Sequence, residues 1–228
     1  FDMEAPRFDL EFLNISNNKF TEDDFLLLTT YITNSKKLRE IDLTHTKLSP
    51  EKVGDIITTF AKNNNLQNVS LKLNKLKLRS ERLLPLFRAF LSQKESCDSK
   101  WNSIHLDSNK LTREDLFSLI PLFKRFPKLE TLSLSHNFDH KNEENQNVGE
   151  AILKLLSIPS LKNLYIAGDN KHQLGSELGH FLQSKNNNLE KIDISGNKIR
   201  DMGFLEAIKL IKRSEKLKSI SLSNNGMK

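Results

Sequence analysis

One apolar pattern recurs eight times along the chain and constrains its fold more than any other feature. Each copy has apolar residues at its first, fourth and sixth positions, and six copies have asparagine at the ninth. Thr46 and Asp169 replace the asparagine in the other two. The spacings between copies are 28, 28, 35, 28, 32, 28 and 28 residues. The copies begin at Leu10, Leu38, Leu66, Trp101, Leu129, Leu161, Leu189 and Leu217. Repeats of this length each form one supersecondary unit that stacks on its neighbours.

Each copy matches the signature of a leucine-rich repeat, and its residue types suit a strand that turns into a loop. Apolar residues two positions apart point to the same face of a strand. The asparagine side chain offers a donor and an acceptor to backbone groups that are unpaired where the chain leaves the strand. Aspartate or threonine performs part of that task, so the two exceptions are compatible with the pattern.

The stretches between the copies are predicted to be helices. Thr21 and Thr112 are each followed three residues later by aspartate, which resembles a capping box, and Ser49 precedes a proline that suits the first helical position. Apolar residues then recur at helical spacing, for example over residues 53–60. We therefore predict an α/β leucine-rich repeat solenoid of the ribonuclease-inhibitor-like horseshoe class. Residues 1–228 would form one domain of about eight strand–loop–helix repeats, with a parallel sheet on the concave face.

The composition excludes several other classes of protein. No run approaches the roughly 18 apolar residues of a membrane span. Cys97 is the only cysteine, which excludes an internal disulfide framework and a multi-cysteine zinc site. Lysine and arginine outnumber aspartate and glutamate by 35 to 29, and the resulting charge of +6 is weak evidence for a nucleic-acid partner. Basic residues follow most predicted helices, where cations complement the negative helix end.

The aromatic residues are mostly phenylalanine, with 14 Phe against 2 Tyr and 1 Trp. Phenylalanine has no polar atom to satisfy, so we expect those in the predicted helical segments to pack between the helices and the strands. These are Phe25, Phe60, Phe87, Phe90, Phe117, Phe123, Phe126, Phe181 and Phe204. Trp101 occupies the first apolar position of its copy and is predicted to lie in the core.

Four segments resemble the CARMIL family, whose members link actin capping protein, the branched-actin nucleator and myosin I. Residues 46–51 (TKLSPE) resemble the family's GTKLSPE segment, and residues 66–80 resemble LKGVSLDLSNCELRSG. Residues 134–138 (LSHNF) resemble LALGKNF, including an insertion after the phenylalanine. Residues 191–203 are similar to KVDISGNGMGDMG. The resemblance covers roughly residues 30 to 228.

This resemblance implies a non-enzymatic scaffold, the repeat region of a CARMIL-type regulator of actin capping and actin assembly. Its partners would be proteins of the actin cytoskeleton, and it would act in the cytoplasm at the cell cortex or leading edge. In the family, the capping-protein motif, a pleckstrin-like membrane domain and a dimerisation segment lie outside the repeats. Membrane association would therefore come only through those regions. We expect the chain to be a fragment of a longer protein, truncated at both ends, because it starts at Phe1 and stops directly after a strand-like run.

Two surfaces are candidate protein-binding sites. The outward positions of the concave face are small, polar and mixed in charge, and solenoids commonly bind partners there. These candidates are Glu40, Asp42, Lys72, His105, Asp107, Ser133, Ser135, Tyr165, Asp193 and Ser195. The second surface is the four-residue insertion after Phe138, because insertions map to surface loops. Its candidates are Asp139, His140, Glu143 and Glu144, whose spacing matches no metal-binding motif, so we predict no metal ion.

The residue patterns favour no enzymatic function. His45, His105 and His136 are predicted at strand positions, but no nucleophile motif, glycine-rich phosphate loop or paired carboxylates accompany them. We therefore predict no catalytic residue, cofactor or small-molecule substrate. The concave face has almost no aromatics and no basic rows, which argues against nucleic acid. Two alternatives stay open: a Ran-GTPase-activating protein, although no acidic tail is present, and a ribonuclease-inhibitor-type enzyme inhibitor, although the chain has one cysteine and is basic.

Overall fold

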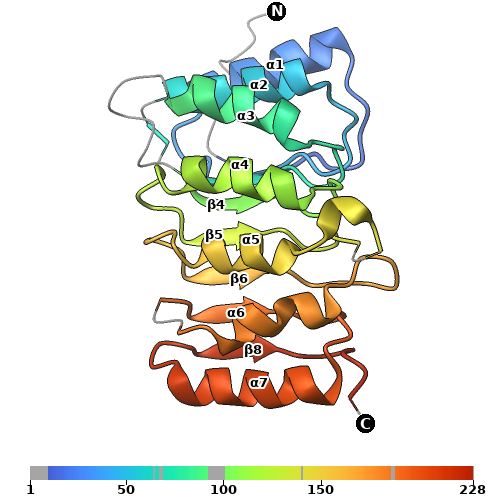
Figure 1. The fold of residues 1–228 in the computed structure, drawn as a ribbon. Helices are drawn as coiled ribbons and strands as arrows, with labels where there is room; N and C mark the ends of the chain where they lie inside the picture. The colour runs from blue at the N-terminus through green and yellow to red at the C-terminus, as the bar shows by residue number, and fades with distance from the viewer. Residues whose placement is uncertain are drawn as a thin grey trace, which may run out of the picture.

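Eight short strands lie side by side in one parallel sheet, one strand for each repeat of the sequence. The computed structural model describes residues 10–63, 65–66, 69–91, 101–139, 141–185 and 188–227. The sheet follows chain order, with strands β1 (Phe12–Asn14), β2 (Glu40–Asp42), β3 (Val69–Lys72), β4 (Trp101–His105), β5 (Thr131–Ser133), β6 (Asn163–Tyr165), β7 (Lys191–Asp193) and β8 (Ser219–Ser221). This topology confirms the predicted α/β leucine-rich repeat solenoid (Figure 1).

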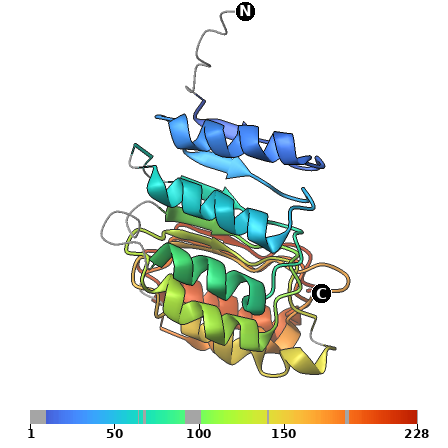
Figure 2. The ribbon, with the colours of Figure 1, turned by 90° about the horizontal axis from the view of Figure 1, so that it is seen from above.

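Helices cover one face of the sheet, and each packs against the next helix along the chain. They are α1 (Glu22–Asn34), α2 (Pro50–Lys62), α3 (Ser80–Leu91), α4 (Arg113–Phe123), α5 (Val148–Leu155), α6 (Gly179–Gln183) and α7 (Arg200–Arg213), with 3₁₀ helices η1 (Glu143–Asn145) and η2 (Gly175–Leu178). A helix with its side chains is about 10 Å wide, whereas strands are about 4.8 Å apart. Stacking therefore bends the array, and Figure 2 shows α1, α2 and α3 successively displaced.

The predicted helix caps are present. Thr21 and Thr112 each accept a hydrogen bond from the backbone N–H of the aspartate three residues later, and that aspartate accepts one from the threonine N–H in return. Ser49 accepts from the N–H of Lys52, and Pro50 begins the helix. These reciprocal bonds satisfy backbone donors that a helix N-terminus leaves unpaired, so the sequence marks where these helices begin.

The core lies between the sheet and the helices. The fourth positions of the repeats form one row across the strands, and the six inner members of that row are at most 2% exposed. These are Ile41, Leu71, Ile104, Leu132, Leu164 and Ile192. The outer members, Leu13 and Ile220, are only partly buried because each has a neighbouring strand on one side.

The third repeat is offset by two residues from the predicted register. Leu71, predicted at the sixth position, pairs with Ile41 and Ile104 and so occupies the fourth. Leu76, not Asn74, consequently stands at the ninth position, and the strand spacings around it are 30 and 33 residues. Residues 69, 71 and 73 are all apolar, and a shift of two keeps each side chain on the same face.

Asparagines at the ninth position connect the turns of neighbouring repeats. The Asn137 carboxamide oxygen accepts from the backbone N–H groups of Asn109 and Leu111, at 2.8 and 3.1 Å. Its amide nitrogen donates to the carbonyls of Leu106 and Leu134, at 3.0 and 2.8 Å. Asn109, Asn197 and Asn225 are buried in the same way and make equivalent bonds. These side chains replace the hydrogen bonds that the sheet supplies within the strands.

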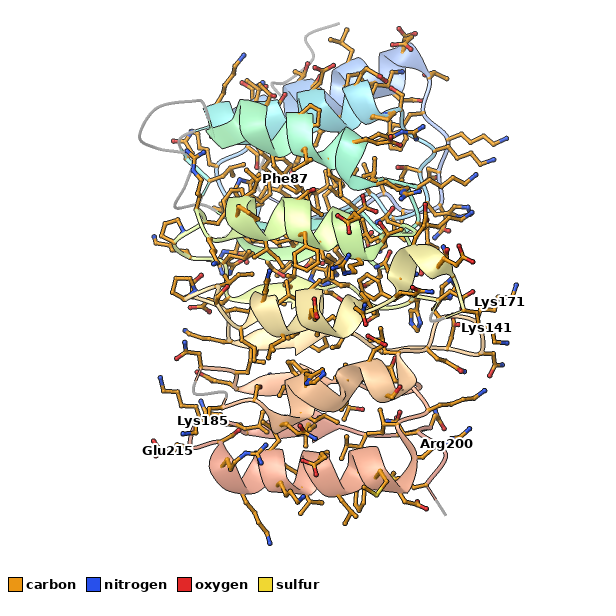
Figure 3. The ribbon with its side chains drawn as sticks, in the orientation of Figure 1. Phe87, Lys141, Lys171, Lys185, Arg200 and Glu215 are labelled. Atoms are coloured by element: carbon orange, nitrogen blue, oxygen red, sulfur yellow. The ribbon has the colours of Figure 1, made fainter. Side chains whose placement is uncertain are left out.

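The phenylalanine prediction is confirmed for Phe60, Phe87, Phe123, Phe126 and Phe181, which are at most 3% exposed. The Phe87 ring (Figure 3) packs edge-on against Phe123 and Phe126, with centroids 6.0 and 6.1 Å apart. Trp101 lies in the core, as predicted, with its ring 5.7 Å from that of Phe60. The prediction is weaker for Phe25, Phe117 and Phe204, which are partly exposed, and the side chain of Phe90 lies outside the described residues.

The prediction that three histidines lie on strands is correct for His105 alone. It is the last residue of β4, whereas His45 and His136 lie in the turns after their strands. Both of these turn residues have a φ of 58°, the left-handed region. The strands are shorter than the apolar pattern suggests, because the turn begins directly after the sixth position.

Candidate interaction face

One residue from each strand contributes to a continuous row along the concave face. The strand pairing aligns these eight side chains across the whole sheet, on the face opposite the helices. We call this the central row: Asn14, Asp42, Lys72, His105, Ser133, Tyr165, Asp193 and Ser221. Six of the ten concave-face candidates predicted from sequence fall in it, and one of them, Lys72, does so because of the two-residue offset of the third repeat. Glu40 lies in the adjacent row, and Asp107, Ser135 and Ser195 lie just beyond the strand ends.

The N-terminal half of the row contains an ion pair beside a histidine. The Lys72 ammonium donates to the Glu40 carboxylate at 2.6 Å, and both side chains are less than a third exposed. A ring nitrogen of His105 is 2.8 Å from the Ser103 hydroxyl. Burial lowers the pKa of His105, and the positive charge of Lys72 acts in the same direction although Asp107 opposes it. His105 is therefore a neutral hydrogen-bonding group near pH 7.

Several predicted serines are committed to hydrogen bonds at the strand ends. The Asp107 carboxylate accepts from the Ser133 hydroxyl at 2.6 Å and from the Ser135 backbone N–H at 2.7 Å. Ser133 and Ser135 are 4% and 7% exposed, so they offer a partner little surface. The hydroxyl and N–H of Ser195 bond to Asp193 in a similar arrangement. These serines fix the loops that follow the strands.

Tyr165 is the aromatic side chain of the central row, between Ser133 and Asp193. It is partly exposed, so its ring and hydroxyl are available on the concave face. Four carboxylates lie on this face (Glu40, Asp42, Asp107 and Asp193) against two lysines (Lys72 and Lys191). The face is therefore mildly acidic, although the whole chain carries +6.

Sequence reasoning missed a ladder of alternating charges just before the strands. Glu130, Lys162, Glu190 and Lys218 hold the second position of four consecutive repeats. Lys162 bonds to Glu130 at 2.5 Å, and Lys218 bonds to Glu190 at 2.7 Å. The bond to Glu130 raises the pKa of Lys162, and the bond to Lys218 lowers that of Glu190. The alternation of sign at one repeat position was the signal that could have revealed this ladder.

The inserted loop is fastened to the preceding repeats. The Arg79 guanidinium lies 3.3 Å from the buried Asp115 and 3.5 Å from Glu144. Asn145 is buried and donates to the carbonyl of Asp139. Glu143 and Glu144 are both exposed, and Glu144 is the one that lies against Arg79. The candidate His140 lies outside the described residues, as does Cys97.

Asp169 takes an outward position where other repeats bury asparagine. Partial burial raises its pKa, but hydrogen bonds from the backbone N–H groups of His172 and Lys171 and from the His172 ring outweigh this and lower it to about 2. A ring nitrogen of His136 lies 3.6 Å away. No group of three or more acidic, histidine or cysteine side chains in the described ranges is placed to hold a metal ion.

We expect Asp169 to stabilise the fold above pH 3.8, its unperturbed pKa, and to lose that contribution as the pH falls toward about 2. Because the side chain is 45% exposed, solvent screening reduces the effect to about 1 kcal/mol. Thermal unfolding of the wild type and Asp169→Asn at several pH values tests this. The two curves should converge in acid, with Asp55→Asn as a surface control. Curves that stay parallel through this window would contradict the prediction.

Comparisons with known proteins place the chain among leucine-rich repeat proteins. The family model described as Leucine Rich Repeat matches residues 9–30. With the eight-stranded sheet, this match settles the fold. The chain is a leucine-rich repeat solenoid. Among solved structures, the tropomodulin C-terminal domain of Caenorhabditis elegans is 15% identical, with 83% of this chain and 92% of that chain covered and a TM-score of 0.41.

Three curated relatives show which leucine-rich repeat proteins the chain resembles. Rho GTPase-activating protein gacW of Dictyostelium discoideum is 30% identical over 85% of this chain and 17% of its own length. Protein CARMIL of the same organism is 25% identical over 95% of this chain and 21% of its own length. The human capping protein, Arp2/3 and myosin-I linker protein 3 is 24% identical over 86% of this chain and 14% of its own length. The solenoid thus spans at most about a fifth of these relatives, and it resembles a CARMIL-like repeat region.

No helix in the described ranges is long and apolar enough to cross a membrane. The repeats and the relatives together point to an interaction module, and the concave face is the surface on which the predicted site residues gather.

Proposed function

We propose that this solenoid is the repeat scaffold of a CARMIL-type regulator of actin capping and actin assembly. It acts by binding protein rather than by catalysis, in the cytoplasm at the cell cortex. The observation that carries the proposal is the likeness to Protein CARMIL along 95% of the chain. The resemblance of four segments to the CARMIL family also supports it, because these segments include residues outside the repeat consensus.

The central row and its neighbours would form the binding surface. A protein partner is favoured because the face is mixed in charge and offers an aromatic anchor, Tyr165, beside the carboxylate of Asp193. The Lys72–Glu40 pair and neutral His105 add polar groups at the other end. Since carboxylates outnumber lysines here, the complementary surface would carry basic groups.

Isothermal titration against actin capping protein, Arp2/3 complex and a myosin-I tail tests the proposal. We expect at least one of them to bind, and Tyr165→Ala combined with Asp193→Lys to weaken binding at least about thirtyfold, because a central aromatic anchor and a complementary charge are lost together. Glu81→Lys with Ser118→Ala, exposed on α3 and α4, is the control and should leave binding unchanged. If none of the three proteins binds, the proposed role of these repeats as the binding scaffold is wrong. Binding that survives the concave substitutions would move the site to another face.

A small-GTPase regulator is the second candidate, favoured by the 30% identity to a Rho GTPase-activating protein. The sequence-based alternative, a Ran-GTPase-activating protein, would need a basic residue on a repeat loop to engage the GTPase. Arg79 lies on such a loop, but Asp115 and Glu144 engage its guanidinium. Stimulated GTP hydrolysis by Rho or Ran in the presence of the purified chain would favour this candidate over the scaffold.

A further inference from the structure

A second surface, separate from the concave face, carries a row of lysines. At the edge where each strand ends and the chain turns toward its helix, six consecutive repeats each present an exposed lysine. We call this set the loop-edge row: Lys47, Lys77, Lys110, Lys141, Lys171 and Lys198. Figure 3 shows Lys141 and Lys171 projecting from this edge together with Arg200, while Lys185 and Glu215 lie at the opposite edge.

The backbone of four of these lysines is in an unfavourable conformation. Lys47, Lys77, Lys110 and Lys198 have φ values of 57°, 56°, 63° and 53°, the left-handed region that favours glycine. This conformation costs a side-chain-bearing residue about 1 kcal/mol. Glycine does occupy it in the last repeat, at Gly226. His45, Ser108 and His136 have similar φ values in the same turns, so the turn imposes this conformation, and lysine occupies a position that glycine would adopt more readily.

The loop-edge row has few compensating partners. None of its six ammonium groups forms an ion pair within the part of the chain that the structure describes. Nearby carboxylates are already engaged: Asp139 and Asp169 accept backbone hydrogen bonds, and Glu144 pairs with Arg79. The exceptions include the exposed Glu143 and the exposed Glu51 and Glu81, which lie in the first turns of α2 and α3. Ammonium groups outside the described ion pairs therefore recur along the edge, one from each of six repeats.

We propose that the loop-edge row binds an extended, acidic polypeptide segment running along the solenoid, across successive repeats. Neighbouring strands are about 4.8 Å apart, so five intervals span about 24 Å, the length of about seven extended residues. A single line of charges fits one extended chain. The apolar residue after each of four lysines (Leu48, Leu78, Leu111 and Ile199) is at most 7% exposed, so it is not available to insert into a membrane. Phe138, at the same edge, is buried and cannot stack on a nucleic-acid base.

Fluorescence anisotropy with a labelled peptide of about ten glutamates tests this proposal. Binding should weaken as NaCl is raised from about 50 to about 200 mM, because exposed charges are screened. Replacing Lys47, Lys77 and Lys110 with glutamine should weaken it about tenfold. Glutamine at Lys124, Lys128 and Lys185, which are exposed at the opposite edge, makes the same change in net charge and should have little effect. Equal loss from both triple variants would overturn the proposal.

A glycine variant separates binding from folding. Lys47→Gly, Lys77→Gly and Lys110→Gly together relieve the left-handed strain, so the melting temperature should be retained or raised while peptide binding is lost. A fall in melting temperature would mean that these lysines support the fold. Vesicles rich in phosphatidylserine and a short single-stranded RNA are the competing probes. Tighter binding of either than of the peptide would assign the row to that partner and overturn the proposal. Because the concave face is left intact, these outcomes are independent of the actin-protein titrations.

Discussion

Gly149→Ala is expected to destabilise the protein by about 3 kcal/mol or more, because the new methyl group has no space. A Cβ atom at Gly149 would lie 2.0 Å from the carbonyl oxygen of Glu177 and 2.9 Å from its carbonyl carbon. The obstacle is backbone, so a side-chain rotation cannot relieve the contact. Helix α5 and the 3₁₀ helix η2 would have to separate.

That separation is costly because η2 is fastened on its other side. Leu174 and Leu178 are buried, and the N–H of Leu174 bonds to the Asn197 side chain. Gly149 itself donates its N–H to the Glu177 carboxylate at 3.2 Å. Moving η2 would therefore disturb two repeats at once.

Gly179→Ala is the matched control. Nothing lies within 4 Å of a Cβ atom at Gly179, which begins α6. Alanine has a higher helix propensity than glycine, so we expect no loss and a gain of up to about 1 kcal/mol. Urea unfolding monitored by circular dichroism measures both variants. A cost below about 1 kcal/mol for Gly149→Ala would show that η2 moves freely.

Asn137→Ala is expected to cost about 3 kcal/mol, the second large effect. It removes the acceptor for the N–H groups of Asn109 and Leu111 and the donor to the carbonyls of Leu106 and Leu134. Asn137 is 3% exposed, so water cannot replace these bonds without a local opening. The loss should lower both the unfolding free energy and the protection of the Leu111 amide from hydrogen exchange.

Asn18 holds the ninth position of the first repeat and provides the comparison. It is exposed, and its amide nitrogen donates to the carbonyls of Ile15 and Ser16 in its own turn. Asn18→Ala should therefore cost less than about 1 kcal/mol, since water can take over. Equal losses at the two positions would show that the connection between repeats contributes nothing beyond the local turn.

The spacing and residue pattern of the repeats predicted most of the fold because these signals are local or strictly periodic. The capping residues Thr21, Ser49 and Thr112 act within one helical turn. The burial of the fourth and sixth positions follows from strand alternation alone. The third repeat escaped prediction because residues 69, 71 and 73 satisfy two registers equally well. Only the pairing of Leu71 with Ile41 and Ile104 selects one of them.

The candidate site, like the fold, could be predicted from the sequence only in part. The sequence by itself determined the number of strands, three helix starts and which residues face the concave side, because each depends on neighbours within a few positions. It could not determine that Ser133 and Ser135 are buried against Asp107, or that Arg79 holds the inserted loop. Those contacts join residues more than 25 positions apart.

The tertiary structure alone also decided where the lysines lie. In the sequence the lysines appear as scattered positive charges, some of them near helix ends. Stacking brings one lysine from each of six repeats to the same edge, and none of the six forms an ion pair with another described residue. The physical reason is that a solenoid converts a sequence period into a line in space, so a charge of little consequence in one repeat becomes a continuous field along six.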